Sequence, residues 1–191
     1  MECFKEFLNE TMGVPESDVE LWAAKLTLRQ VPKNEFILQP GQHSNYTYFT
    51  DSGVLRMYNI DSNGKEHIVQ FAPEKHMVFD RGSTYLNRPS MYFIQAIVDS
   101  EVVYFPKGIM TEIIKTYPNS AEKNTLLLNS WIARMQERIA LLIGATAEER
   151  YLDFLTTYPN YLNRAPLWMI ASYLGITPES LSRVRKELVT K

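Results

Sequence analysis

Residues 167–186 of the chain read LWMIASYLGITPESLSRVRK, and the spacing of their apolar residues predicts two short helices joined by a tight turn. In the first half, the residues that share one helical face are Ile170, Ala171 and Leu174. Gly175 follows at once, and glycine ends a helix readily because it enters the left-handed conformation at little cost. The first helix is therefore expected to stop at this glycine.

The second half of the stretch carries the signals of a new helix. Thr177 is a favourable N-cap, and Pro178 occupies the first helical position, where a missing N–H group costs nothing. An apolar stripe follows at Leu181, Val184 and Leu188. Helices this short with so tight a turn must pack on each other, so the stretch resembles a helix-turn-helix, whose second helix enters the major groove of DNA. The alternative is an ordinary helical hairpin in a core.

The polar face of the second helix favours the first interpretation over a merely solvated face. Arginine can pair with O6 and N7 of guanine, glutamate can accept from the cytosine amino group, and serine or lysine can hold phosphates. Glu179, Ser182, Arg183 and Lys186 gather opposite the apolar stripe. We predict DNA contacts from Thr177, Glu179, Ser180, Ser182, Arg183 and Lys186.

Composition sets limits on the class of protein. The 191 residues are 45% hydrophobic and carry a formal net charge of −2, as in an ordinary globular protein, with a mildly basic C-terminal part on an acidic body. A single cysteine, Cys3, excludes an intramolecular disulfide and any all-cysteine iron–sulfur or zinc site within one chain. Without a signal peptide or a run of about 18 apolar residues, we expect neither secretion nor a membrane span, but a cytoplasmic protein.

The N-terminal half changes from helical to strand-like patterns. Two short helices are expected between residues 3 and 28, broken at Gly13 to Pro15. Short runs rich in β-branched and aromatic residues then alternate with turn signals, at 36–38, 46–50, 54–60, 67–71, 92–98 and 102–105. Asn63-Gly64 predicts a hairpin. Strands this short and regular indicate an antiparallel sandwich, barrel or roll.

A long helix is predicted from Asn119 to about Thr146. Apolar and small residues recur there in steps of four and three, at Ala121, Thr125, Leu128, Ile132, Met135, Ile139 and Leu142. Such a heptad seam is typical of a helix that pairs with a copy of itself. The predicted dimer interface is Leu128, Ile132, Met135, Ile139 and Leu142, and the alternative is that the seam packs on the chain's own sheet. One more helix is expected at 148–158.

Four stretches add a resemblance to this order of elements: QPG at 39–41, DSGVLR at 51–56, NGKE at 63–66 and ESLSR at 179–183. With them the whole chain resembles the Crp/Fnr family of bacterial transcription regulators. The resemblance implies an α+β fold: an antiparallel β-roll (double-stranded β-helix or jelly-roll type) as a sensor domain at 1–117, a dimerisation helix at 118–146, and a helix-turn-helix domain at 147–191. The domain lacks an obvious wing because the chain ends at Lys191, so we expect fewer phosphate contacts.

The function that the resemblance implies is sequence-specific DNA binding by a homodimer at a near-palindromic site. Glu179, Ser182 and Arg183 match the family's base readers, so a guanine is expected opposite Arg183. The implied partners are double-stranded DNA, a second copy of the chain, RNA polymerase and a small-molecule effector, with no membrane.

The effector is not specified, because the chain departs from the family's cyclic-nucleotide pattern. Residues 79–83 (FDRGS) contain no Gly-Glu step for a ribose, and Pro89 replaces the arginine that precedes the phosphate-binding serine. We therefore expect an effector other than a cyclic nucleotide, although a cyclic-nucleotide-responsive regulator with an atypical pocket is an alternative. By correspondence with the family's phosphate-binding stretch, the candidate pocket residues are Arg81, Ser83, Tyr85, Ser90 and Tyr92. One cysteine excludes an oxygen-sensing cluster, and haem is not expected from isolated histidines.

The sequence gives less support to two other classes of function. A metal-dependent enzyme of the cupin type needs two histidines and a carboxylate that converge on one metal, whereas His43, His67 and His76 are isolated in the sequence. We therefore predict no enzyme. A ligand-sensing dimer module that has lost DNA binding is disfavoured by the intact set of Glu179, Ser182 and Arg183.

Overall fold

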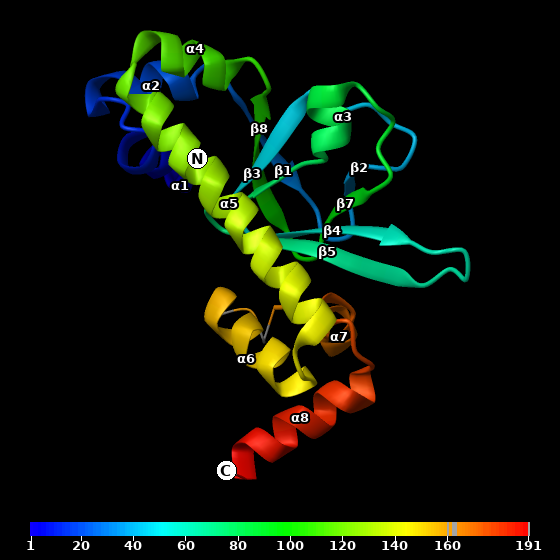
Figure 1. The fold of residues 1–191 in the computed structure, drawn as a ribbon. Coiled ribbons are helices and arrows are strands. Elements are labelled where there is room, and N and C mark those ends of the chain that lie inside the picture. The colour runs from blue at the N-terminus through cyan, green and yellow to red at the C-terminus, as the bar shows by residue number, and fades with distance from the viewer. Residues whose placement is uncertain (160, 162–163, 191) are drawn as a thin grey trace. The chain divides into compact units, whose positions relative to one another are not determined.

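A computed structural model describes residues 1–159, 161 and 164–190, so the chain end at Lys191 lies outside the described residues. The chain divides into two compact units (Figure 1). The first contains residues 1–59 and 70–128, and the second contains residues 60–69 together with residues from 129 onward. Their boundary falls inside the long helix α5 (Asn119–Gly144). The three-part division at residues 117 and 146 is a functional one and stays a prediction.

Two four-stranded sheets form the β-roll. One has the strand order β1 (Thr27–Val31), β8 (Ser100–Pro106), β3 (Tyr46–Ser52) and β6 (Met77–Val78). The other has the order β2 (Phe36–Leu38), β7 (Phe93–Ala96), β4 (Val54–Ile60) and β5 (Glu66–Pro73). The described strand pairings are antiparallel. The predicted α+β fold with an antiparallel β-roll is therefore confirmed, and β5 forms one edge of its sheet.

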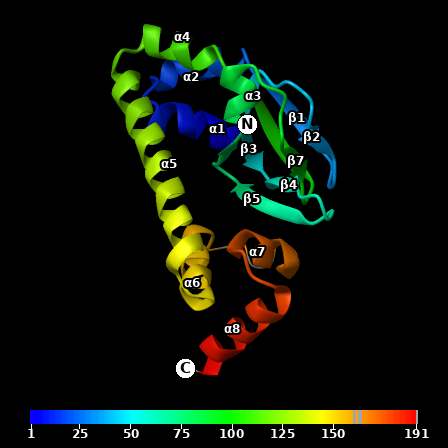
Figure 2. The same ribbon diagram turned by 45° about the vertical axis from the view of Figure 1, so that its right-hand side comes forward.

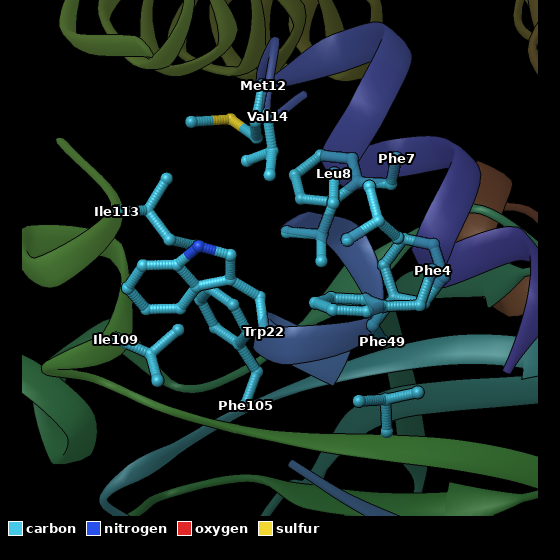
Figure 3. Close-up of a cluster of buried hydrophobic side chains, with 12 residues drawn as sticks. Phe4, Phe7, Leu8, Met12, Val14, Trp22, Phe49, Phe105, Ile109 and Ile113 are labelled. Atoms are coloured by element: carbon cyan, nitrogen blue, oxygen red, sulfur yellow. The ribbon is translucent and has the colours of Figure 1, made fainter. Parts of the chain in front are cut away.

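Helices cover the outer face of the first sheet. They are α1 (Glu2–Glu6), the π-helical turn η1 (Phe7–Thr11), α2 (Glu16–Ala23) and α4 (Ile109–Thr116), and Figure 2 shows them beside the strands. Phe49, Val103 and Phe105 point to this face because side chains alternate along β3 and β8. The ring of Phe4 meets Phe49 edge to face at 5.1 Å. Figure 3 shows Trp22 in the same cluster, which forms an apolar core of the first unit.

The structure corrects three predictions in this unit. The helix predicted to continue to Leu28 ends at Ala23, because Thr27 and Leu28 pair with Tyr104 and Val103 of β8. Such long-range pairing overrides a local helical pattern. Strand β6 and helix α3 (Arg81–Leu86) were missed because each is too short to show a period. The predicted strand 92–98 is limited to the four residues of β7.

The hairpin and the helix-turn-helix form as predicted. Gly64 has φ +79°, and the turn closes with a hydrogen bond of 3.0 Å from the Asp61 N–H group to the Lys65 carbonyl. The C-terminal helices are α6 (Ala147–Thr157), α7 (Leu167–Leu174) and α8 (Pro178–Thr190). Gly175 ends α7 with φ +67°. The predicted apolar residues are buried at Ile170, Ala171, Leu174, Leu181 and Val184.

Candidate nucleic-acid interface

The polar face of α8 lies open to solvent. Glu179, Ser182, Arg183 and Lys186 are exposed, while Leu181 and Val184 on the opposite side are buried against the rest of the second unit. Only three residues separate α7 from α8, so the two helices pack on each other. The face of α8 that this packing buries decides which of its side chains point outward. Four of the six predicted DNA-contact residues are thus brought together on one accessible surface, which we call the reading face.

The other two predicted residues, Thr177 and Ser180, form the cap of α8. The Ser180 N–H group donates to Thr177 Oγ1 over 3.2 Å, and the two hydroxyls lie 3.3 Å apart. Thr177 is exposed and Ser180 is half-buried. Their main structural role is to satisfy the first turn of the helix. They border the reading face without belonging to its centre.

The electrostatics of the first turn keep Glu179 a hydrogen-bond acceptor. Its own backbone N–H group and the Thr177 hydroxyl lower the pKa of the Glu179 carboxyl below its usual value. The side chain is therefore ionised at neutral pH. A carboxylate only accepts hydrogen bonds, so it can pair with an amino group on a base edge but repels a phosphate.

Helices α5 and α6 support this pair of helices. Thr146 and Glu149 form a capping box at the start of α6. Arg134 of α5 makes a fork of two hydrogen bonds to the Asp153 carboxylate of α6, at 2.9 and 2.5 Å, and this carboxylate raises the pKa of the guanidinium. The fork fixes α6 on the last three turns of α5.

Sequence reasoning missed two arginines that hold the end of α7. Arg138 of α5 donates to the carbonyl of Tyr173 over 3.1 Å, and Arg150 of α6 donates to the carbonyl of Leu174 over 2.8 Å. Both cations lie at the negative end of the helix dipole. Nothing local in the sequence marks either residue, because their partners are 35 and 24 positions away.

The predicted dimer seam is open in the single chain. Four of its five interface residues are exposed, and the fifth is half-buried; the exposed ones are Leu128, Ile132, Ile139 and Leu142. Leu127, which lies off the seam, packs instead on the apolar core of the first unit. Leu142 also lies near the turn at Gly175. If residue 175 had a Cβ atom, this atom would be 3.2 Å from a methyl group of Leu142.

The predicted effector residues are only partly gathered. Ser83 is buried, and its hydroxyl accepts the Ser44 N–H group over 2.8 Å. The Ser90 hydroxyl exchanges two 3.1 Å hydrogen bonds with the backbone of Tyr92. Both serine hydroxyls are thus engaged by the chain itself.

Two of the three other candidates lie against Phe79. The Arg81 guanidinium is 4.8 Å from the ring of Phe79, and burial lowers its pKa. The ring of Tyr85 lies 5.9 Å from that of Phe79, and Tyr85 is exposed. In the same stretch the buried carboxylate of Asp80 accepts the Gly82 N–H group over 2.8 Å. A carboxylate in this position disfavours a phosphate.

The three histidines are separate in space as in sequence. His67 Nε2 pairs with Asp61 over 2.8 Å, His76 Nδ1 lies 2.9 Å from the carbonyl of Glu74, and His43 is exposed. Within residues 1–159, 161 and 164–190, no three histidine, cysteine or carboxylate side chains are grouped to bind a metal ion. None of the helices over this same range is both long and apolar enough to cross a bilayer.

Known proteins share both the sensor fold and the order of domains. Residues 28–117 match the family model of the cyclic nucleotide-binding domain. The anaerobic regulatory protein of Haemophilus influenzae is 29% identical over 167 residues, covering 82% of this chain and 64% of the relative. Regulatory protein HlyX of Actinobacillus pleuropneumoniae is 29% identical over 168 residues, covering 82% and 69%. The chain therefore spans about two thirds of the length of these curated relatives.

A solved structure gives the same result for the fold. FixK2 of Bradyrhizobium japonicum superimposes with a TM-score of 0.72 at 22% identity, over 86% of this chain and 85% of that one. The β-roll of this chain is followed by a helix-turn-helix, and the relatives are named as regulatory proteins. The chain belongs to the Crp/Fnr family of transcription regulators.

Proposed function

We propose that this chain is a DNA-binding transcription regulator that acts in the cytoplasm as a homodimer on a near-palindromic site. The observation that carries the proposal is the reading face of α8, which is exposed on a closed helix-turn-helix whose apolar positions are buried. A helical hairpin with only a structural role has no need for Glu179, Ser182 and Arg183 together on its open side. RNA polymerase and a small-molecule effector are the further partners that we propose.

The chemistry of the reading face assigns a role to each side chain. Arg183 would donate to O6 and N7 of a guanine, and ionised Glu179 would accept from a cytosine amino group. Ser182 and Lys186 would hold phosphates and set the register of the helix in the groove. Each bidentate pair discriminates against a wrong base by about 1–3 kcal/mol.

The open seam on α5 supports dimerisation. The exposed apolar side chains of Leu128, Ile132, Ile139 and Leu142, with Met135 between them, would be covered by the same face of a second copy. Two reading faces related by a twofold axis then meet half-sites about one helical turn apart. The operator must therefore be a near-palindrome.

The sensor domain would take an effector other than a cyclic nucleotide. A cyclic phosphate needs fixed donors, whereas the hydroxyls of Ser83 and Ser90 are already bonded within the chain. The buried carboxylate of Asp80 adds a like charge in the same stretch. Arg81, Tyr85 and Tyr92 remain the candidate effector residues.

Selection of bound duplexes from a random DNA pool, with and without cyclic AMP, tests the proposal. Enrichment of a palindrome in both arms is the expected result. Enrichment only with cyclic AMP would support the alternative of a cyclic-nucleotide-responsive regulator with an atypical pocket. No enrichment in either arm would favour a dimeric sensor module that has lost DNA binding.

A pair of variants then tests the base-reading assignment. Arg183→Ala removes a bidentate pair of about 1–3 kcal/mol from each of the two half-sites, so it should lower affinity for the selected palindrome at least about 25-fold and abolish preference for guanine at one position of each half-site. Arg185→Ala removes the same charge from the same helix, outside the reading face, and should leave the base preference unchanged. Equal preference profiles for Arg183→Ala and the wild type would show that the assignment is wrong.

A further inference from the structure

The guanidinium of Arg138 occupies an unusual place in the second unit. It lies 3.7 Å above the ring of Tyr173 and donates to three backbone carbonyls, those of Ile68, Val69 and Tyr173. Its Nε atom is buried and has no hydrogen-bond partner among the described residues. Burial lowers the pKa of this side chain. A buried charge held by carbonyls and one aromatic face, with no carboxylate among these contacts, costs more free energy than an apolar side chain of similar volume. Stability alone therefore does not explain an arginine here.

The three carbonyls belong to two different elements. Ile68 and Val69 lie on the free edge of β5, where backbone groups have no neighbouring strand. Tyr173 is in the last turn of α7, whose final carbonyls have no partner within the helix. Arg138 therefore joins the long helix α5 to a strand edge and to the first helix of the helix-turn-helix.

Ser172 of α7 makes a second link to the same strand edge. Its hydroxyl accepts the Ile68 N–H group over 3.0 Å and donates to the Glu66 carbonyl over 2.9 Å. The hydroxyl thus takes the place of one residue of a neighbouring strand. Ser172 is bonded to residues 66–69 directly, and the next residue, Tyr173, is bonded to them through Arg138. These two links leave α7 little freedom to rotate about its own axis.

Two further side chains, Arg150 and Leu142, lie at the end of α7. Arg150 donates to the Leu174 carbonyl over 2.8 Å. At Gly175 a Cβ atom would lie only 3.2 Å from Leu142 and 3.3 Å from Arg150, so the glycine lets both side chains approach the turn. We call Arg138, Leu142, Arg150 and Ser172 the α7 socket.

The geometry points to Arg138 as a positioning residue that sets the spacing between the two half-sites read by the dimer. This inference rests on the proposed function. The dimer seam and Arg138 are on the same helix, and the seam ends at Leu142, which lies so close to the turn before α8 that a Cβ atom at Gly175 would be 3.2 Å from it. Because that turn is so short, the orientation of α7 on α5 is passed on to α8. The distance between two symmetry-related reading faces therefore depends on the socket.

The test uses the full-length protein and inverted repeats built from the duplex that the wild type selects, with the half-sites moved by −1, 0, +1 and +2 base pairs. The wild type should prefer its own spacing by at least tenfold. Arg138→Met keeps the length of the side chain but removes every donor, and it should reduce this preference below threefold. Gln136→Met, an exposed position of the same helix, should keep the wild-type preference.

Two other measurements separate positioning from a general loss of structure. Sedimentation should show that Arg138→Met is still a dimer, and its preference for guanine within each half-site should stay unchanged. Arg138→Lys keeps the charge but loses the planar guanidinium, whose two terminal nitrogens donate to the three carbonyls. It should therefore also broaden the spacing preference, which keeps the test open if Arg138→Met does not fold.

The outcomes distinguish this inference from the proposed function. Equal weakening at every spacing by both Arg138 variants, with the wild-type ratio intact, would overturn the inference and leave the DNA-binding function standing. Failure of the wild type to bind any duplex would overturn both.

Discussion

The dimer seam gives a prediction whose size follows from the structure. Ile139 is 57% exposed in the single chain and lies near the middle of the C-terminal half of the seam. Full burial of an isoleucine side chain stabilises by about 1.5–3 kcal/mol, so covering this 57% exposed part contributes about 0.9–1.7 kcal/mol for each protomer. Both copies of Ile139 are buried in one dimer, and together they contribute about 2–3 kcal/mol.

Ile139→Lys removes this contribution and places a charge on the seam. The dissociation constant of the dimer should rise about 30- to 150-fold, since each 1.4 kcal/mol corresponds to a factor of ten. Sedimentation equilibrium over a range of protein concentrations measures this constant directly. DNA affinity should fall as well, because one protomer reads only one half-site.

Leu126→Lys is the matched control. Leu126 is 59% exposed on the same helix but lies off the seam, so the same substitution there removes no apolar contact with the second copy. Its dissociation constant should stay within about threefold of the wild type, since surface substitutions cost little. A dimer that resists Ile139→Lys, or one that both variants weaken equally, would refute the seam.

Three other predictions concern the helix-turn-helix and the hairpin. Lys186→Ala should weaken binding to every duplex alike and, with two copies in a dimer, lower the slope of log affinity against log salt by about 2, as measured by titrations at several salt concentrations; an altered base preference would contradict a phosphate contact. Gly175→Ala should lower the free energy of unfolding in urea by about 1–2 kcal/mol, because φ is +67° there. Gly64→Ala carries the same backbone strain with no atom within 4 Å and is the control, since only the Gly175 variant should also lose DNA affinity. A hydrogen bond from His67 lowers the pKa of the Asp61 carboxyl to about 2, so the stabilisation of the hairpin tip by this carboxylate is complete above about pH 4 and is lost as the pH falls towards 2. An NMR titration measures the pKa of Asp61 in the wild type and in His67→Ala, where it should rise. An unshifted pKa in the wild type, or an equal pKa in the two proteins, would contradict the prediction.

The four side chains on the open face of α8 could be predicted because the signals are local, whereas their contact with DNA stays a prediction. The turn glycine, the Thr-Pro start and the apolar spacing all lie within 20 residues, and a helix fixes the direction of each side chain from sequence position alone. The same periodicity placed Ile132, Ile139 and Leu142 on an open stripe of α5. That this stripe forms the dimer interface stays a prediction.

The effector stretch could not be predicted to the same depth. Correspondence with the family selected Ser83 and Ser90 as candidates, but it did not indicate the hydrogen bonds that occupy their hydroxyls. The partner of Ser83 is Ser44, 39 positions away, and nothing in either local pattern indicates that distance. The role of the buried Asp80 as a helix cap was missed for the same reason that α3 was missed, since a helix of six residues shows no clear period.

By itself, the sequence determined the class of fold, the existence of the helix-turn-helix and the side chains on its open face, because the patterns that indicate them repeat within a few positions along the chain. Only the tertiary structure decided where β1 begins, what lies beside the edge of β5, and how α7 is held. Those features depend on pairs such as Arg138 with Ile68 and Ser172 with Glu66, which are 70 and 106 positions apart. Their bonds form only after the chain has closed long loops, and the free energy of that closure is settled by the packing of the whole unit rather than by any local pattern.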